Sequence, residues 1–235
     1  MDESIVWTLS EWPVNLPEED QLVFLGPAER VRWESFRFEK RRREWLLGRV
    51  TAKKLVHGLY PAVEYPAIEI HNEPEGAPFV IAQGERLPGC LSVSHRDQLA
   101  AAAWTPAGTP IGIDLETVEP RSNGFVEDYF TGAEQAAVAA LDGVDQITWV
   151  NVVWSAKEAV LKVLRKGLRL DTRAVEILPA SEEPFPPEGW QPLTVRCALL
   201  PEVRAYWTQR GGYVLTLAAG GRRDELDLMQ VNIDA

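Results

Sequence analysis

The sequence has few cysteines, few histidines and no long apolar run, and each shortage excludes a class of protein. Its 235 residues include two cysteines and three histidines. Cys90 and Cys197 are too far apart in sequence to suggest a zinc site, and two cysteines make no disulfide framework. No apolar run approaches the roughly 18–20 residues that span a membrane, and the N-terminus lacks the pattern of a secretion signal. We therefore expect a cytoplasmic protein that does not associate with membranes.

The net charge of −11 is unevenly distributed along the chain. Residues 26–57 contain ten Lys and Arg against four Asp and Glu, whereas the remainder contains 14 basic and 31 acidic residues. An acidic protein is unsuited to nonspecific binding of nucleic acid, so we expect no nucleic-acid partner. The basic segment predicts a site for a discrete anion or an acidic partner, although a solvated helix face produces the same pattern.

The order of predicted elements indicates an α+β protein with two halves. The main elements are a strand at 4–9, a helix at 39–60, a strand at 111–116, helices at 125–141 and 146–164, and several strands after residue 170. The stretch TPAGTP at 105–110 is the best linker candidate, because it combines proline, glycine and threonine. We predict an N-terminal half at 1–106, a C-terminal half at 111–235 and a linker at 105–110. No sequence repeat is visible, but the halves could be similar folded units.

The strand PIGIDLE carries two carboxylates in an apolar setting. Side chains alternate along a strand, so Asp114 and Glu116 lie on one face together with Gly112. Two carboxylates at one place repel each other unless a cation neutralises them, and oxygen ligands suit Mg²⁺. A carboxylate pair at a strand end that binds arginines fits the same pattern equally well.

The helix WSAKEAVLKVL supplies a third carboxylate and a lysine. Glu158 and Lys162 are four residues apart and share one face, and Lys157 lies close to that face. Such a pair is usually an exposed salt bridge of little energetic weight. In this mostly apolar helix it also suits a site for metal and phosphate, in which the carboxylate binds the metal and the lysine offsets charge on a phosphate leaving group.

A third motif, SVSHRD, places Ser94 and His95 where a strand runs into a turn. Groups at such positions often face a ligand. A single histidine is more often structural, but His95 could donate a hydrogen bond to a phosphate.

The motifs SVSH, PIGIDLE, WSAKEAVLK and KGL, in this order, resemble the Sfp-type 4′-phosphopantetheinyl transferases. The resemblance extends to PAERVRWESF, EWLLGRVTAKKL, EGAPFV and DYFTGAEQAAV, and therefore covers most of the chain. It implies two similar α+β halves that form a pseudo-dimer with coenzyme A in the cleft between them. A protein built in this way is expected to be a monomer.

The resemblance also implies an activity and a set of site residues. The family transfers the phosphopantetheine arm of coenzyme A to a serine of an apo acyl or peptidyl carrier protein and releases 3′,5′-ADP. By similarity, Asp114, Glu116 and Glu158 bind Mg²⁺, Glu158 is also the candidate base, and Lys162 assists departure of the leaving group. The residues assigned to coenzyme A are Ser94 and His95 at its phosphates, Arg32, Arg49 and Lys53 near its 3′-phosphate, and Lys157 beside the catalytic helix face.

The chain departs from the family pattern at three positions. Ala77 stands where many relatives have lysine, Arg96 where many have a small residue, and Arg165 where many have glycine. Arg96 or Arg165 could replace the charge that is missing at Ala77.

Two other functions remain open at this point: a different Mg²⁺-dependent phosphotransfer or hydrolysis enzyme, and a non-enzymatic protein that binds coenzyme A or a carrier. The motifs do not distinguish between fatty-acid, polyketide and nonribosomal-peptide carriers.

Overall fold

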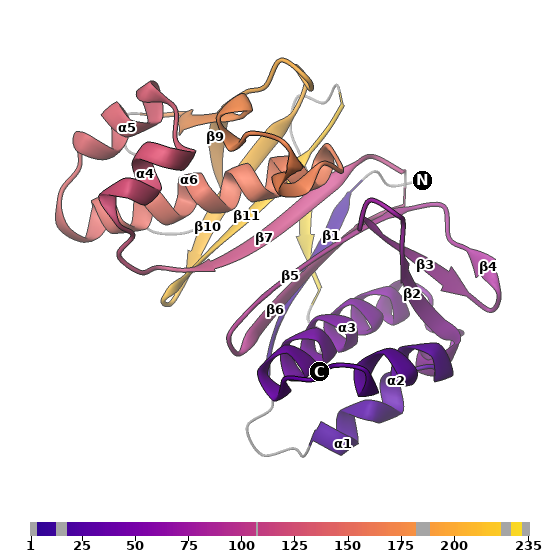
Figure 1. Ribbon diagram of the computed structural model, residues 1–235. Coiled ribbons are helices and arrows are strands. Elements are labelled where there is room, and N and C mark those ends of the chain that lie inside the picture. Colours follow the sequence, from indigo (N-terminus) through magenta and orange to yellow (C-terminus); the bar gives the residue numbers. More distant parts are fainter. Residues whose placement is uncertain (1–3, 13–17, 107, 182–188, 222–226, 232–235) are drawn as a thin grey trace. The chain divides into compact units, whose positions relative to one another are not determined.

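The computed structural model describes residues 4–12, 18–106, 108–181, 189–221 and 227–231. The chain forms two compact units, seen in Figure 1. Unit 1 comprises Met1–Thr109 and Arg223–Ala235, and unit 2 comprises Pro110–Arg222.

Unit 1 combines a long helix with two sheets. Its helices are α1 (Glu18–Gln21), α2 (Pro27–Glu34) and α3 (Glu39–Leu59), with single 3-10 turns at Leu22–Phe24 and Tyr65–Ala67. Its strands are β1 (Ile5–Glu11), β2 (Ile68–Asn72), β3 (Pro78–Ala82), β4 (Glu85–Arg86), β5 (Cys90–Arg96), β6 (Leu99–Thr105) and β12 (Leu228–Gln230). One sheet has the order β12-β1-β6-β5 and the other β2-β3-β4. Helix α3 packs its apolar side against β6, β5 and β1, which closes the core of the unit.

Unit 2 is built in a similar way around one sheet. Its helices are α4 (Asn123–Tyr129), α5 (Gly132–Ala139) and α6 (Gly143–Val163), with 3-10 turns at Gly167–Arg169 and Thr172–Ala174. Its strands are β7 (Ile111–Thr117), β8 (Glu176–Pro179), β9 (Gln191–Arg196), β10 (Arg204–Arg210) and β11 (Tyr213–Ala219). The strands form an antiparallel sheet of order β7-β11-β10-β9-β8, and α6 packs against β7, β11 and β10.

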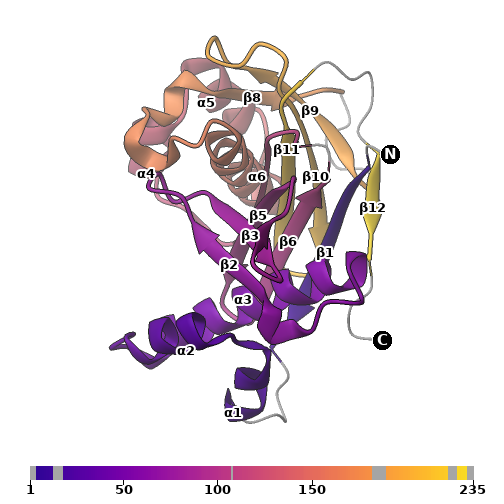
Figure 2. The ribbon, with the colours of Figure 1, turned by 90° about the vertical axis from the view of Figure 1, so that its right-hand side faces the viewer.

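The predicted α+β class is confirmed, and two predicted boundaries are wrong. The predicted helix at 125–141 is two helices, because Phe130 is extended and the Thr131 hydroxyl caps the start of α5 by accepting from the N–H of Glu134. The end of the chain belongs with unit 1 and not with the second half, because β12 pairs in parallel with β1 (Figure 2). Within the predicted linker at 105–110, Ala107 lies outside the described residues.

The two units share a core arrangement that the sequence does not display as a repeat. The antiparallel series β1-β6-β5 has its counterpart in β7-β11-β10. Glu11 pairs with the first residue of β6, and Thr117 pairs with the first residue of β11, so the registers also match. In this register Thr8 of unit 1 corresponds to Asp114 of unit 2, and Ser10 corresponds to Glu116.

A buried ion pair fixes the core of unit 1. Glu29 is the third residue of α2, and its carboxylate accepts the N–H of Gly26 at 3.1 Å and the N–H of Ile70 in β2 at 3.2 Å. Lys53 of α3 is wholly buried, pairs with Glu29, and donates to the carbonyl of Phe24 at 2.7 Å. Burial lowers the pKa of Lys53, and Glu29 opposes that shift. One side chain thus joins α2, α3 and β2.

An equivalent buried ion pair occurs in unit 2. Glu134 is the third residue of α5, and it accepts the N–H of Thr131 at 2.6 Å and the N–H of Ile177 in β8 at 2.7 Å. Lys157 of α6 pairs with Glu134 at 2.8 Å and donates to the carbonyl of Thr172 at 3.0 Å. Both partners are fully buried, and burial lowers the pKa of Lys157 and raises that of Glu134. Lys53 and Lys157 occupy the same position in their 21-residue helices.

We predict that Lys157→Met destabilises the protein by about 3–5 kcal/mol, because it leaves the carboxylate of Glu134 buried and uncompensated. The measurement is the thermal unfolding midpoint, with the exposed Lys166→Met as the matched control. Adding Glu134→Leu to the first variant should recover part of the loss, since two apolar partners leave no unpaired charge. Equal midpoints for Lys157→Met and Lys166→Met would contradict a structural role for the pair.

Candidate functional site

The predicted carboxylates of unit 2 lie where α6 crosses β7. Asp114 and Glu116 share one face of β7, and this face packs against α6. On α6, the side chains of Trp154, Glu158 and Lys162 recur every four residues and lie along one face. The helix therefore presents an indole, a carboxylate and an ammonium in sequence along the acidic face of the strand.

At one end of this series, Lys162 binds Asp114. The Lys162 ammonium lies 2.8 Å from Asp114 Oδ1 and donates to the carbonyl oxygen of Ile113, also at 2.8 Å. Asp114 is buried, whereas the side chain of Lys162 remains 29% exposed. Lys162 therefore places its ammonium group beside a buried carboxylate while its side chain remains partly accessible to solvent.

Glu158 lies next to this pair with an unsatisfied charge. Its Oε1 is buried and accepts no hydrogen bond from any described residue. Burial raises the pKa of Glu158, Asp114 raises it further, and Lys162 opposes the shift. A buried carboxylate oxygen without a donor is an arrangement that a bound cation would satisfy.

The third predicted ligand, Glu116, has other partners. Its Oε1 accepts the indole N–H of Trp154 at 3.1 Å, and its Oε2 accepts from the guanidinium of Arg121 at 3.1 Å. Sequence reasoning left arginine partners open for this strand, and Arg121, five residues after Glu116, is one.

The donor set fits a cation held by two carboxylates better than by three. Among the residues that the structure describes, no group of three or more His, Cys, Asp and Glu side chains is placed to hold a metal ion. Asp114 and Glu158 interact electrostatically, and Glu158 has a buried oxygen that accepts no hydrogen bond. Hard oxygen ligands of this kind suit Mg²⁺, which typically keeps several waters and binds substrate phosphates.

Gly112 makes the close approach of α6 to β7 possible. A Cβ at this position would lie 2.0 Å from the backbone oxygen of Ala159 and 3.0 Å from the Cβ of Lys162. A side chain here would push the helix, and with it Glu158 and Lys162, away from the strand. The close packing of α6 on β7 therefore explains why the GIDLE motif has glycine at this position.

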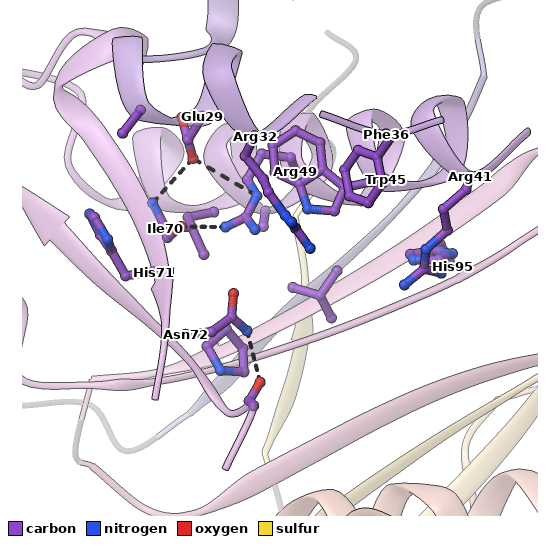
Figure 3. A pocket seen from close by; sticks show the side chains of 16 residues that line it. Glu29, Arg32, Phe36, Arg41, Trp45, Arg49, Ile70, His71, Asn72 and His95 are labelled. Carbon is purple, nitrogen blue, oxygen red and sulfur yellow. Dashed lines mark hydrogen bonds and ion pairs between the residues drawn. The ribbon is translucent and has the colours of Figure 1, made fainter. Parts of the chain in front are cut away.

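A second group of predicted residues meets in a pocket of unit 1. This cavity of about 540 Å³ is lined by residues of α2, α3, β2 and β5, including Arg32, Arg49 and His95 (Figure 3). Its volume lies in the range of small-molecule sites. Phe36 and Trp45 add aromatic walls, with the guanidinium of Arg32 4.8 Å from the Phe36 ring centroid.

The cations of this pocket are not equivalent. Arg49 donates to the carbonyl oxygen of Ile70 at 2.6 Å and lies 3.8 Å from Glu29, so it is largely fixed and compensated. Arg32 and Arg41 are exposed, and neither guanidinium makes a hydrogen bond or ion pair with a described residue. Sequence reasoning did not select Arg41, although the basic run EKRRRE contains it.

Three residues assigned to coenzyme A lie elsewhere. Lys53 and Lys157 are wholly buried in the two internal ion pairs and have no exposed surface to offer a ligand. Ser94 is adjacent to His95 on β5, so its side chain points to the opposite face from the pocket. The two lysines are core residues, because a lysine in a motif can serve the fold; the assignment of Ser94 to coenzyme A stays a prediction.

Comparison with known proteins identifies the family. The family model "4'-phosphopantetheinyl transferase superfamily" matches residues 110–218, which contain the acidic strand and α6. The chain is also 32% identical over 100 residues to a holo-[acyl-carrier-protein] synthase of Staphylococcus carnosus, covering 40% of this chain and 80% of that protein. The chain belongs to the 4′-phosphopantetheinyl transferase superfamily. The resemblance drawn from the motifs is confirmed.

Two further matches concern other members of this superfamily. The chain is 29% identical over 146 residues to "4'-phosphopantetheinyl transferase psf-1" of Bacillus pumilus, covering 62% of this chain and 60% of that protein. A crystal structure of a holo-(acyl-carrier-protein) synthase from Bacillus anthracis, in complex with CoA (3′,5′-ADP), matches with 18% identity and a TM-score of 0.40. That match covers 47% of this chain and 94% of the synthase. Within the described part of this superfamily member, no helix has the length and apolarity needed to cross a membrane.

We predict that Gly112→Ala destabilises unit 2 by about 1–3 kcal/mol, because the new methyl group overlaps the backbone of α6. Gly132→Ala is the control, since a Cβ at Gly132 meets nothing within 4 Å. Chemical denaturation with a far-UV circular dichroism readout compares the two variants. A loss of the same size in both would show that the contact with Ala159 is not the cause.

We also predict a pH-dependent stabilisation by Glu158→Gln in metal-free protein. The pKa of Glu158 is raised in the folded state, so its contribution to stability is present below the unfolded-state pKa and is lost as pH rises through the folded-state value. The variant should therefore gain in unfolding midpoint over the parent at pH 8, and the gain should shrink at pH 4. Thermal unfolding in the presence of EDTA measures both. A gain independent of pH would argue against this cause.

Proposed function

We propose that the protein transfers the 4′-phosphopantetheine arm of coenzyme A to a serine of an apo acyl or peptidyl carrier protein. The serine oxygen forms a bond to the phosphorus of the arm, the bond from that phosphorus to the leaving oxygen breaks, and 3′,5′-ADP departs. The observation that carries this proposal is the cluster of Asp114, Glu158 and Lys162 within the segment that matches the transferase family.

The residues of this cluster have separate roles in the proposed reaction. Mg²⁺, bound at the carboxylates of Asp114 and Glu158 beside Glu116, would neutralise charge on the pyrophosphate oxygens. Glu158 receives the proton of the attacking serine, directly or through a water, and its raised pKa makes it a stronger base than an exposed carboxylate. Lys162, partly exposed, offsets the charge that develops on the leaving 3′,5′-ADP.

The pocket of unit 1 is proposed to receive the nucleotide end of coenzyme A. Arg32, Arg41 and His95 line it and can bind phosphate oxygens, while Arg49 forms part of its wall. Arginine binds phosphate well because its planar guanidinium presents several donors in a fixed geometry. The basic segment that contains these arginines also suits an acidic carrier protein, whose approach it would accelerate.

Intact mass spectrometry tests the function. The protein is incubated with coenzyme A, Mg²⁺ and a panel of apo carrier proteins, with Asp114→Ala and Glu158→Gln as matched inactive variants. A carrier that gains one phosphopantetheine arm with the parent protein alone, and only when Mg²⁺ is present, supports the proposal. Binding of coenzyme A without transfer to any carrier in the panel would favour a non-enzymatic binding protein.

We predict that Arg32→Ala and Arg41→Ala each weaken the binding of coenzyme A by about 10-fold or more, since each removes a charge-assisted hydrogen bond. The loss should be much smaller for 3′-dephospho-coenzyme A, which lacks the phosphate that these arginines are proposed to bind. Isothermal titration calorimetry with both ligands measures the difference.

Lys40→Ala is the control, because Lys40 lies in the same basic run but is exposed and paired with Glu44 and Asp97. Equal losses for the two ligands would place Arg32 and Arg41 away from the 3′-phosphate.

A further inference from the structure

Glu116 differs from the other two carboxylates because both of its oxygens are already bound. Oε1 accepts from Trp154 and Oε2 from Arg121, each at 3.1 Å. The side chains of Glu116 and Arg121 are 12% and 18% exposed, so water competes little for these bonds. A carboxylate held in this way has a counter-ion and a hydrogen bond on each of its oxygens.

The two residues that hold Glu116 are themselves fixed. The Nε of Arg121 donates to Asn151 Oδ1 at 3.0 Å, and the wholly buried Asn151 donates to the carbonyl oxygens of Glu119 and Ile147. Trp154 packs edge-on against the rings of Phe125 and Tyr129, at 4.9 and 5.3 Å between centroids. Arg121 and Trp154 are therefore fixed in position, and they hold the carboxylate of Glu116 in one orientation.

Asp114 and Glu158 differ from Glu116 in their hydrogen bonds. One lysine, Lys162, lies beside two acidic side chains, and a buried oxygen of Glu158 accepts no hydrogen bond from the described residues. A cation placed here would bind the Glu158 oxygen that accepts no hydrogen bond. A cation bound by Glu116 would compete with the guanidinium of Arg121 for the same carboxylate, and loss of a partly buried ion pair is unfavourable.

We infer that Arg121 and Trp154 keep Glu116 out of metal coordination, so that this protein binds its divalent cation through two carboxylates, Asp114 and Glu158. Arg121 is then a positioning residue that sets the number of protein ligands. The remaining coordination positions stay with water and with phosphate oxygens of the substrate. The inference rests on the proposed function, because it concerns the metal site of the proposed transferase.

Coordination number separates this inference from a purely electrostatic effect. Mn²⁺ serves as the probe, and the broadening of its electron paramagnetic resonance lines in ¹⁷O-enriched water counts the bound waters. A six-coordinate ion with two single-oxygen carboxylate ligands keeps about four waters, and one with three keeps about three. Glu116→Gln should leave the count unchanged, whereas Arg121→Gln frees the carboxylate and should lower it by about one.

The affinity for Mn²⁺ provides a second readout. Asp114→Asn and Glu158→Gln should each weaken binding by at least about 10-fold, as expected for removal of a direct ligand. Glu119→Gln removes a charge near Arg121 without touching a proposed ligand, and it calibrates the electrostatic effect of Glu116→Gln. Circular dichroism establishes that each variant is folded.

The possible results separate the inference from the function that it rests on. Gain of a bound water in Glu116→Gln would show that Glu116 is a ligand and would overturn the inference while leaving the metal site in place. Unchanged Mn²⁺ binding in both Asp114→Asn and Glu158→Gln would remove the proposed metal site and the inference together. If Arg121→Gln does not fold, the number of waters bound to Mn²⁺ in Glu116→Gln still shows whether Glu116 is a metal ligand.

Discussion

A buried lysine–glutamate pair is the interaction on which each unit depends. In both units the glutamate caps the start of a short helix, binds the N–H of a neighbouring strand and holds a lysine from the long central helix. Removing charge from water is unfavourable, and additional hydrogen bonds offset part of this cost. Backbone carbonyls provide such bonds to both Lys53 and Lys157. The pair thereby fixes α3 or α6 at one depth and rotation over its sheet.

This shared framework carries different chemistry in the two units. The residue after the buried lysine is Lys54 in α3 but Glu158 in α6. The matching strands differ in the same way, because β1 has Thr8 and Ser10 where β7 has Asp114 and Glu116. Three acidic side chains thus gather in unit 2, while the corresponding residues of unit 1 are neutral or basic. Unit 1 instead has a pocket lined by arginines, so the proposed roles in metal and nucleotide binding are divided between similar folds.

Within unit 2, the balance of charge distinguishes three carboxylates that look alike in the sequence. Glu134 is neutralised by a buried lysine and serves the fold. Glu116 is held by Arg121 and Trp154. Glu158 has a buried oxygen that accepts no hydrogen bond from the described residues, and burial raises its pKa because it disfavours the charged form. The carboxylate that the protein leaves unsatisfied is the one to which the proposed reaction assigns both metal binding and proton transfer.

The sequence by itself determined the family, the α+β class, the strand face that Asp114 and Glu116 share and the helix face that Glu158 and Lys162 share, because alternation along a strand and the four-residue spacing of a helix are local properties of the chain. Tertiary structure alone decided that Lys53 and Lys157 are core residues, that Ser94 points away from the pocket, and that Arg41 lines it. It also decided the partners of Glu116, since hydrogen bonds to Trp154, 38 residues away, depend on how α6 packs on β7. A motif specifies which chemical groups are present, but burial and long-range contacts determine which of them are free to act on a ligand.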